Sequence, residues 1–246
     1  MLAALAAHRA RTLSTTGAIA AAVVGTISIA AGWSWGALLL AMFISASALS
    51  KLGERQKAER MGPVVEKGDE RDATQVLANG GVYAAAALGS MLHPSPIWYA
   101  VGAGALAASA ADTWATEIGT LTKGNPRSII SGKSVPPGTS GGISLPGTAA
   151  AVVGALFIAA AARVAEWPVP LAAVAIGGVA GALADSLLGA TVQARRWCEL
   201  CAVFTERLVH NCGTPTRHAG GLMGFDNDVV NAVCSGVGAL VAILLF

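Results

Sequence analysis

Residues 111–147 read ADTWATEIGTLTKGNPRSIISGKSVPPGTSGGISLPG, and the rest of the chain is organised around this stretch. It begins in an apolar, helix-compatible segment carrying Asp112 and Glu117 and continues into a loop rich in Gly, Pro, Ser and Thr. Three spaced cations precede the turn PPGTSGG: Lys123, Arg127 and Lys133. Carboxylates facing a basic, glycine-rich loop suit a metal-bound polyphosphate, because carboxylates bind Mg2+ and glycines let backbone N–H groups approach phosphate oxygens. The alternative is a solvated connector, although about 25 residues is long for one.

The composition indicates an integral membrane protein. Of the 246 residues, 54% are hydrophobic and only 12% are charged, whereas soluble domains usually carry about 25% charged residues. The 30 glycines and many alanines favour close helix packing in lipid, which also allows a homodimer. A net charge of +2, without a basic cluster interleaved with aromatics, argues against a nucleic-acid partner.

Apolar runs of span length predict an all-α membrane protein with about seven transmembrane helices. The runs cover approximately residues 14–32, 35–51, a third segment that ends near 93, 97–119, 143–163, 171–191 and a last run ending at 246. Trp33 and Trp35 are predicted to anchor the first two spans at the membrane interface.

The loops divide a single polytopic domain, residues 1–246, into recognisable parts. They are a polar segment at 51–75, a predicted phosphate-binding loop at 122–142 and a loop at 192–227. Basic residues concentrate in these loops and in the N-terminal segment, while the connections near 33, 94 and 166 are nearly uncharged. The positive-inside rule therefore predicts a plasma-membrane protein with its N-terminus, long loops and active site facing the cytoplasm and its C-terminus outside.

Most of the polar residues that could bind a ligand or take part in catalysis fall on this predicted cytoplasmic side: Asp69, Asp72, Gln75, Asn79, Asp112, Glu117, Asp185, Asp226 and Asp228. Carboxylates inside spans are costly and tend to be functional, although any single one could be a helix cap or an interhelical hydrogen-bonding group. Ala111-Asp112-Thr113 resembles Ala184-Asp185-Ser186, so two helices could present an aspartate to one metal. Because Asp112 and Glu117 diverge by about 140° on a helix, we predict Mg2+ ligation by Asp112 with Asp185 or Asp228 opposite.

Other residues are predicted to hold phosphate groups. Lys133 is assigned to the catalytic set with Asp112 and Asp185, and Lys133 and Arg127 are candidate phosphate clamps. Glu117 and Lys123 are also assigned to nucleotide or phosphate binding. The turn offers a backbone cradle that does not match a P-loop: Gly138, Thr139, Ser140, Gly141 and Gly142. A helix face for nucleotide or lipid phosphate is predicted from spacings of three and four: Asp72, Gln75 and Asn79.

A cysteine cluster lies in the last polar loop. Cys198-x-x-Cys201 is followed by His210 and Cys212, and three thiolates with one imidazole could bind a structural Zn2+ tetrahedrally. A redox-active pair and cysteines without a special role are the alternatives. Cys234, in the last apolar run, is predicted to serve packing.

Several motifs occur in the order found in a known family: QVLANGG, ADTWATEIG, VPPGTSGGIS, GALADSLLGATVQ and FDNDVVN. From about Arg71 onward the chain resembles the family of phytyl-phosphate kinase of plant chloroplasts and transmembrane protein 19 of animals, as a prokaryotic member. The pattern Asp112-x-x-Ala115-x-x-x-Gly119, followed by Gly132-Lys133 and Gly138-Thr139, is more distantly similar to CTP-dependent dolichol and polyprenol kinases.

The resemblance implies transfer of the γ-phosphoryl group of CTP or UTP to an isoprenoid alcohol or monophosphate, such as phytyl or prenyl phosphate, giving the diphosphate in the latter case. The partners would be a nucleoside triphosphate, an isoprenoid lipid and the bilayer. A cytidylyltransferase that forms a CDP-lipid is the enzymatic alternative, and a transporter is the alternative from another class. A transporter predicts polar groups near the bilayer midplane, whereas here they crowd one side.

Overall fold

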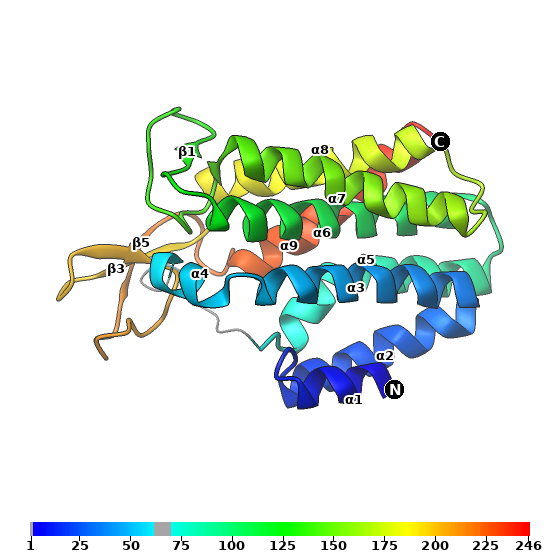
Figure 1. Cartoon of the computed structure of the whole chain (residues 1–246), viewed down its shortest axis with the longest axis horizontal. Coiled ribbons are helices and arrows are strands. Elements are labelled where there is room, and N and C mark those ends of the chain that lie inside the picture. Colours follow the sequence, from blue (N-terminus) through cyan, green and yellow to red (C-terminus); the bar gives the residue numbers. More distant parts are fainter. Residues whose placement is uncertain (1, 62–69) are drawn as a thin grey trace.

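The apolar runs fold into helices that pack side by side, in a computed structural model that describes residues 2–61 and 70–246 (Figure 1). The long helices are α2 (Thr15–Ala31), α3 (Trp33–Lys51), α5 (Ala73–Leu92), α6 (Ile97–Leu121), α7 (Leu145–Val164), α8 (Leu171–Thr191) and α9 (Asn227–Leu244). Two short helices, α1 (Leu2–Arg9) and α4 (Glu54–Met61), flank the first pair. Each predicted apolar run thus corresponds to one long helix.

Within the described residues, 4 helices are long and apolar enough to cross a membrane: α3, α7, α8 and α9. Helix α2 is apolar but has only 17 residues. Helices α5 and α6 have 20 and 25 residues but fall outside this set, because small and polar residues replace large aliphatic ones. The chain is a mostly helical integral membrane protein with these four candidate spans.

Helix α6 lies at the centre of the bundle, where it contacts α5, α7, α8 and α9. Its segment from Gly102 to Ala111 is buried throughout. A Cβ added to Gly181 of α8 would lie 2.4 Å from the Cβ of Ala108, so only glycine lets these helices approach so closely. Between α6 and α9, Ser109 Oγ and Ser235 Oγ are 2.9 Å apart and share a hydrogen bond. Small residues therefore bring α6, α8 and α9 together along their length.

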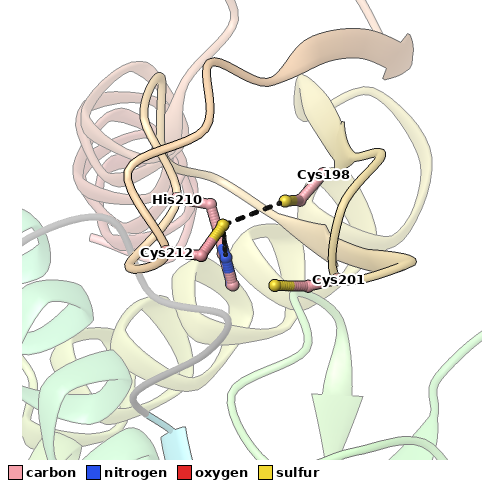
Figure 2. Close-up of side chains that lie close together, drawn as sticks. All are labelled: Cys198, Cys201, His210 and Cys212. Atoms are coloured by element: carbon pink, nitrogen blue, oxygen red, sulfur yellow. Dashed lines mark hydrogen bonds between the residues drawn. The ribbon is translucent and has the colours of Figure 1, made fainter.

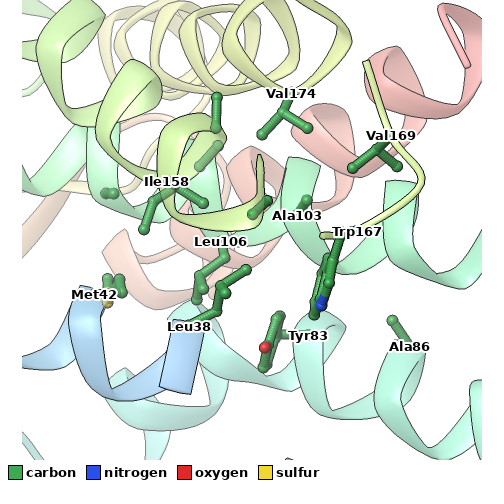
Figure 3. Packing of buried hydrophobic residues seen from close by; sticks show 14 of the residues in the cluster. Leu38, Met42, Tyr83, Ala86, Ala103, Leu106, Ile158, Trp167, Val169 and Val174 are labelled. Atoms are coloured by element: carbon green, nitrogen blue, oxygen red, sulfur yellow. The ribbon is translucent and has the colours of Figure 1, made fainter. Parts of the chain in front are cut away.

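Larger buried side chains pack together in the half of the bundle that is nearer the short connections between helices (Figure 3). Trp35 is 1% exposed and stacks at a tilt on Trp167, with ring centroids 4.5 Å apart. Its backbone carbonyl accepts a hydrogen bond of 2.6 Å from Tyr83 Oη. The prediction that Trp35 is an interfacial anchor is therefore wrong, because the ring belongs to the core, whereas Trp33 is 83% exposed.

The long loops gather at one end of the bundle together with α4, and the short connections lie at the other (Figure 1). The prediction of an all-α chain missed two small sheets in these loops. β1 (Arg127–Ser128) pairs antiparallel with β2 (Gly142–Ile143), and β3 (Arg195–Cys198) lies between β4 (Val203–Thr205) and β5 (Arg217–Gly220). Part of the predicted 51–75 segment, with Asp69, lies outside the described residues.

Candidate active site

A cleft of about 1300 Å³ opens at the end of the bundle where the long loops gather. Helices α3, α5, α6, α8 and α9 contribute side chains to its walls, and the loops 122–144 and 192–226 cover it. Much of the polar sequence that lies far apart along the chain thus meets in one space.

Asp112 of α6 and Asp185 of α8 both line this cleft, and their carboxyl groups are close enough to share a hydrogen bond. The close approach of α6 and α8 at Gly181, one helical turn before Asp185, brings the two together. Asp185 Oδ2 is buried, and no donor in the described part of the chain reaches it. Two adjacent, partly buried carboxylates repel each other unless a proton or a cation lies with them.

This pair fits a magnesium ion that is shared with a substrate. Mg2+ is usually bound through one or two carboxylates plus substrate phosphates, not by a complete protein cage. Asp228 lines the same cleft, yet among the described residues only the cysteine cluster forms a group of three or more converging ligands. The structure therefore brings Asp112 and Asp185 together as predicted, while Asp228 lines the same cleft without converging with them.

The turn PPGTSGG reaches the cleft because Gly141 packs directly on the end of α8. Gly141 has a φ of +76°, and a Cβ there would lie 2.7 Å from the backbone nitrogen of Ala190. All five predicted cradle residues line the cleft: Gly138, Thr139, Ser140, Gly141 and Gly142. Two of their N–H groups are already used inside the turn, because Thr139 donates to Pro136 O and Gly142 to Thr139 O.

The predicted cations Lys123, Arg127 and Lys133 are not among the residues that line the cleft. Lys123 and Lys133 are exposed, and Arg127 Nη1 donates a 2.9 Å hydrogen bond to Gly132 O, back into its own loop. The positive charge of the cleft comes from other residues: Arg11, Lys51, Lys57, Arg71 and Arg207. The antiparallel bridge between Arg127 and Ser134 folds this part of the loop back on itself, and Arg127 and Lys133 remain exposed.

Arg71 and Glu117 belong to one partly buried hydrogen-bond network that lines the cleft. Arg71 Nη2 donates a 3.1 Å hydrogen bond to Ser50 Oγ, which in turn donates a 2.5 Å hydrogen bond to Glu117 Oε1. Glu117 also forms an ion pair with Lys57 of α4, so its carboxylate is held by the protein. Burial lowers the pKa of Arg71, and the charge of Glu117 partly opposes that shift. Glu117 lines the cleft, but its carboxylate neutralises the positive charges of Arg71 and Lys57.

Asp72 caps helix α5 and does not share the predicted helix face. Its Oδ1 accepts a 2.9 Å hydrogen bond from the Gln75 backbone N–H, and the Gln75 side chain accepts from the Asp72 N–H in return. Gln75 and Asn79 do line the cleft, whereas Asp72 does not.

Glu206 lies in the cleft wall between the two large loops. Its Oε1 accepts hydrogen bonds from Ser140 Oγ at 2.5 Å and from Gln193 Nε2 at 2.8 Å. The next residue, Arg207, also lines the cleft, and its Nε is buried without a hydrogen-bond partner in the described residues. Glu206 and Arg207 were not predicted as site residues from the sequence. The signal that could have indicated them is the charged motif Thr-Glu-Arg at 205–207, which directly follows a short β-compatible run.

The cysteine cluster lies beside this wall, in the β3–β5 region (Figure 2). Cys198, Cys201, His210 and Cys212 converge as the spacing predicted. Cys234 is buried in α9, far along the chain from the other three.

The chain is similar along most of its length to a described family of membrane proteins. The model of the family described as integral membrane protein DUF92 matches residues 1–239. The chain belongs to the DUF92 family. This DUF92 protein is 32% identical to Protein PGR of Arabidopsis thaliana over 261 residues, covering 94% of this chain and 88% of the relative.

Two further relatives are named as uncharacterised membrane proteins. One, from Methanocaldococcus jannaschii, is 29% identical over 99% of this chain and 90% of its own length. The other, from a Synechocystis strain, is 30% identical over 71% of this chain and 69% of its own length. No solved structure matches the DUF92 protein. The resemblance to one membrane-protein family, seen in the motifs, is confirmed and extends over nearly the whole chain.

Proposed function

We propose that this DUF92 protein is a membrane kinase that transfers the γ-phosphoryl group of a nucleotide, CTP or UTP, to an isoprenoid monophosphate or alcohol. Phytyl or prenyl phosphate would give the corresponding diphosphate. The observation that carries the proposal is the partly buried Asp112–Asp185 pair, which shares one cleft with a glycine-rich turn and with Arg71 and Arg207.

Phosphoryl transfer needs charge neutralisation and in-line positioning more than covalent chemistry. A Mg2+ held by Asp112 and Asp185 would neutralise phosphate oxygens and orient them. Arg71 is oriented by hydrogen bonds to Ser47 Oγ and Ser50 Oγ, which use two of the five N–H donors that a guanidinium carries. Arg207 offers a buried Nε that has no hydrogen-bond partner in the part of the chain that the structure describes. These two side chains would bind phosphate oxygens in the same cleft.

An apolar groove of about 370 Å³ suits the isoprenoid chain. It lies between α7 and α8 and is lined only by aliphatic side chains: Val152, Leu156, Ala175, Ile176, Val179, Ala180 and Leu183. Val179 and Leu183 also line the polar cleft, so the groove continues into it. Ile176 is 52% exposed on the outer surface of the bundle. A lipid could therefore enter sideways from the bilayer with its phosphate directed toward Asp185.

We further propose that all seven long helices cross the plasma membrane with the cleft facing the cytoplasm. The long loops share one end of the bundle, and the connections at the other end are short. A cysteine introduced at the exposed position His93 should react with a membrane-impermeant maleimide in intact cells, whereas one at Ser131 should react only after lysis. The reverse labelling pattern would show that the cleft faces the outside of the cell.

The activity test uses detergent-purified protein with Mg2+, each γ-labelled nucleotide, and a panel of prenols and prenyl monophosphates. We expect labelled prenyl diphosphate from the intact protein and none from Asp185→Asn. The matched control is Glu166→Gln, a carboxylate-to-amide change at the opposite end of the bundle. Release of pyrophosphate from CTP without transfer of the γ-label would show that the protein is a cytidylyltransferase and not a kinase. Absence of both reactions would favour transport.

A further inference from the structure

Four side chains in the β3–β5 region converge with the geometry of a metal site (Figure 2). Their ligand atoms all lie within 4.8 Å of one another. Cys198 Sγ is 3.6 Å from Cys212 Sγ, and His210 Nδ1 is 3.3 Å from Cys212 Sγ. Tetrahedral zinc with bonds of about 2.3 Å to sulfur and about 2.0 Å to nitrogen has a sulfur–sulfur edge of about 3.8 Å and a nitrogen–sulfur edge of about 3.5 Å. The Cys198–Cys212 and His210–Cys212 separations are close to those edges.

Two tight turns build this arrangement, each supplying two ligands. Cys198 ends β3 opposite Val203 of β4, so the turn between these strands brings Cys201 back toward Cys198. In the second turn, the His210 N–H donates to Thr214 O at 3.0 Å and the Gly213 N–H donates to His210 O at 2.8 Å. Gly213 has a φ of +83°, and this left-handed residue closes the turn that directs His210 and Cys212 to the same point.

We propose that Cys198, Cys201, His210 and Cys212 bind one zinc ion in a closed, structural site. Zinc takes four nitrogen and sulfur ligands and leaves no open position when all four come from the protein. Thiolates select zinc over magnesium, so this site is chemically distinct from the Asp112–Asp185 pair. Cys198 and His210 are buried while Cys201 and Cys212 are exposed, which leaves a path for the ion from solvent.

The zinc site also positions the wall of the cleft. Cys201 and His210 flank the segment that carries Glu206, and Glu206 holds Ser140 and Gln193 by hydrogen bonds. Fixing both flanks would keep Glu206 and Arg207 against the glycine-rich turn. This consequence for catalysis rests on the proposed kinase function, whereas the zinc site itself does not.

Metal analysis of the purified full chain tests the site without any substrate. We expect about one zinc per chain, retained through gel filtration, and a loss of at least tenfold in zinc content in Cys201→Ser and in Cys212→Ser. Cys201 and Cys212 are exposed, so neither change removes a core side chain. The matched control, Cys234→Ala, alters a buried cysteine outside the cluster and should keep its zinc.

A second measurement covers the case in which the variants fold poorly. Wild-type protein stripped with a chelator and reloaded with Co2+ should show the ligand-field and thiolate charge-transfer bands of tetrahedral cobalt, and limited proteolysis within 199–216 should accelerate only in the stripped form. Wild-type protein that neither contains zinc nor takes it up under reducing conditions would overturn the proposal. So would a mapped disulfide between two of these cysteines, or unchanged zinc in both serine variants. Because zinc content is measured without any substrate, a negative zinc result can be distinguished from a negative result in the kinase assay.

Discussion

Replacing Gly141 with alanine measures how strongly the glycine-rich turn depends on its contact with α8. A left-handed conformation costs a residue with a Cβ about 1–2 kcal/mol. The new Cβ would also lie 2.4 Å from the Cβ of Ala190, and overpacking of this kind typically costs about 1–3 kcal/mol. We therefore expect Gly141→Ala to destabilise the loop by about 2–5 kcal/mol and to lift it from the cleft.

Gly132 offers a matched control in the same loop. Its φ is +66°, but a Cβ there would meet nothing within 4 Å, and Gly132 is not among the residues lining the cleft. Gly132→Ala should thus carry only the conformational cost of about 1–2 kcal/mol. The difference between the two variants isolates the contact with Ala190.

The assay compares the thermal midpoint in detergent and kcat/KM for the nucleotide across both variants. An excess of about 2 kcal/mol on Gly141 corresponds to about 30-fold in kcat/KM if it is expressed in nucleotide binding. Equal losses for the two variants would refute the reasoning, because the close approach of Gly141 to α8 would then have no effect on the cleft.

Three further changes test other parts of the site. Asp72→Ala should lower stability by about 1 kcal/mol through loss of the α5 cap, while Asp72→Asn keeps both the cap and the nucleotide KM; a large KM increase in Asp72→Asn would mean that the carboxylate binds nucleotide. Lys57→Met leaves the Glu117 carboxylate without its buried partner and should lower the free energy of unfolding by about 3–5 kcal/mol, measured by chemical unfolding. Adding Glu117→Gln should recover most of this loss. No recovery would show that the loss comes from packing. Arg207→Met should raise the nucleotide KM at least tenfold without shifting the thermal midpoint, and an unchanged KM would remove Arg207 from the phosphate site.

Local sequence chemistry predicted much of the site because some placements depend only on short stretches. Asp112 and Asp185 each follow a run of small residues, and such runs form helices that pack closely enough to bring two carboxylates together. The capping box of α5 was also readable, since Asp72 precedes Gln75 by three residues at a helix start. The helix-face interpretation of Asp72 overlooked that signal.

The sequence by itself determined the membrane class, the helical runs and the family, because these follow from composition, periodicity and ordered motifs. Only the tertiary structure decided which cations serve the cleft. Lys123, Arg127 and Lys133 are nearest the glycine-rich turn in sequence, yet Arg71 and Arg207 line the cleft in their place. The direction of a loop side chain depends on strand pairing and on contacts with distant segments, such as Glu206 with Ser140. Apolar periodicity contains no information about those contacts.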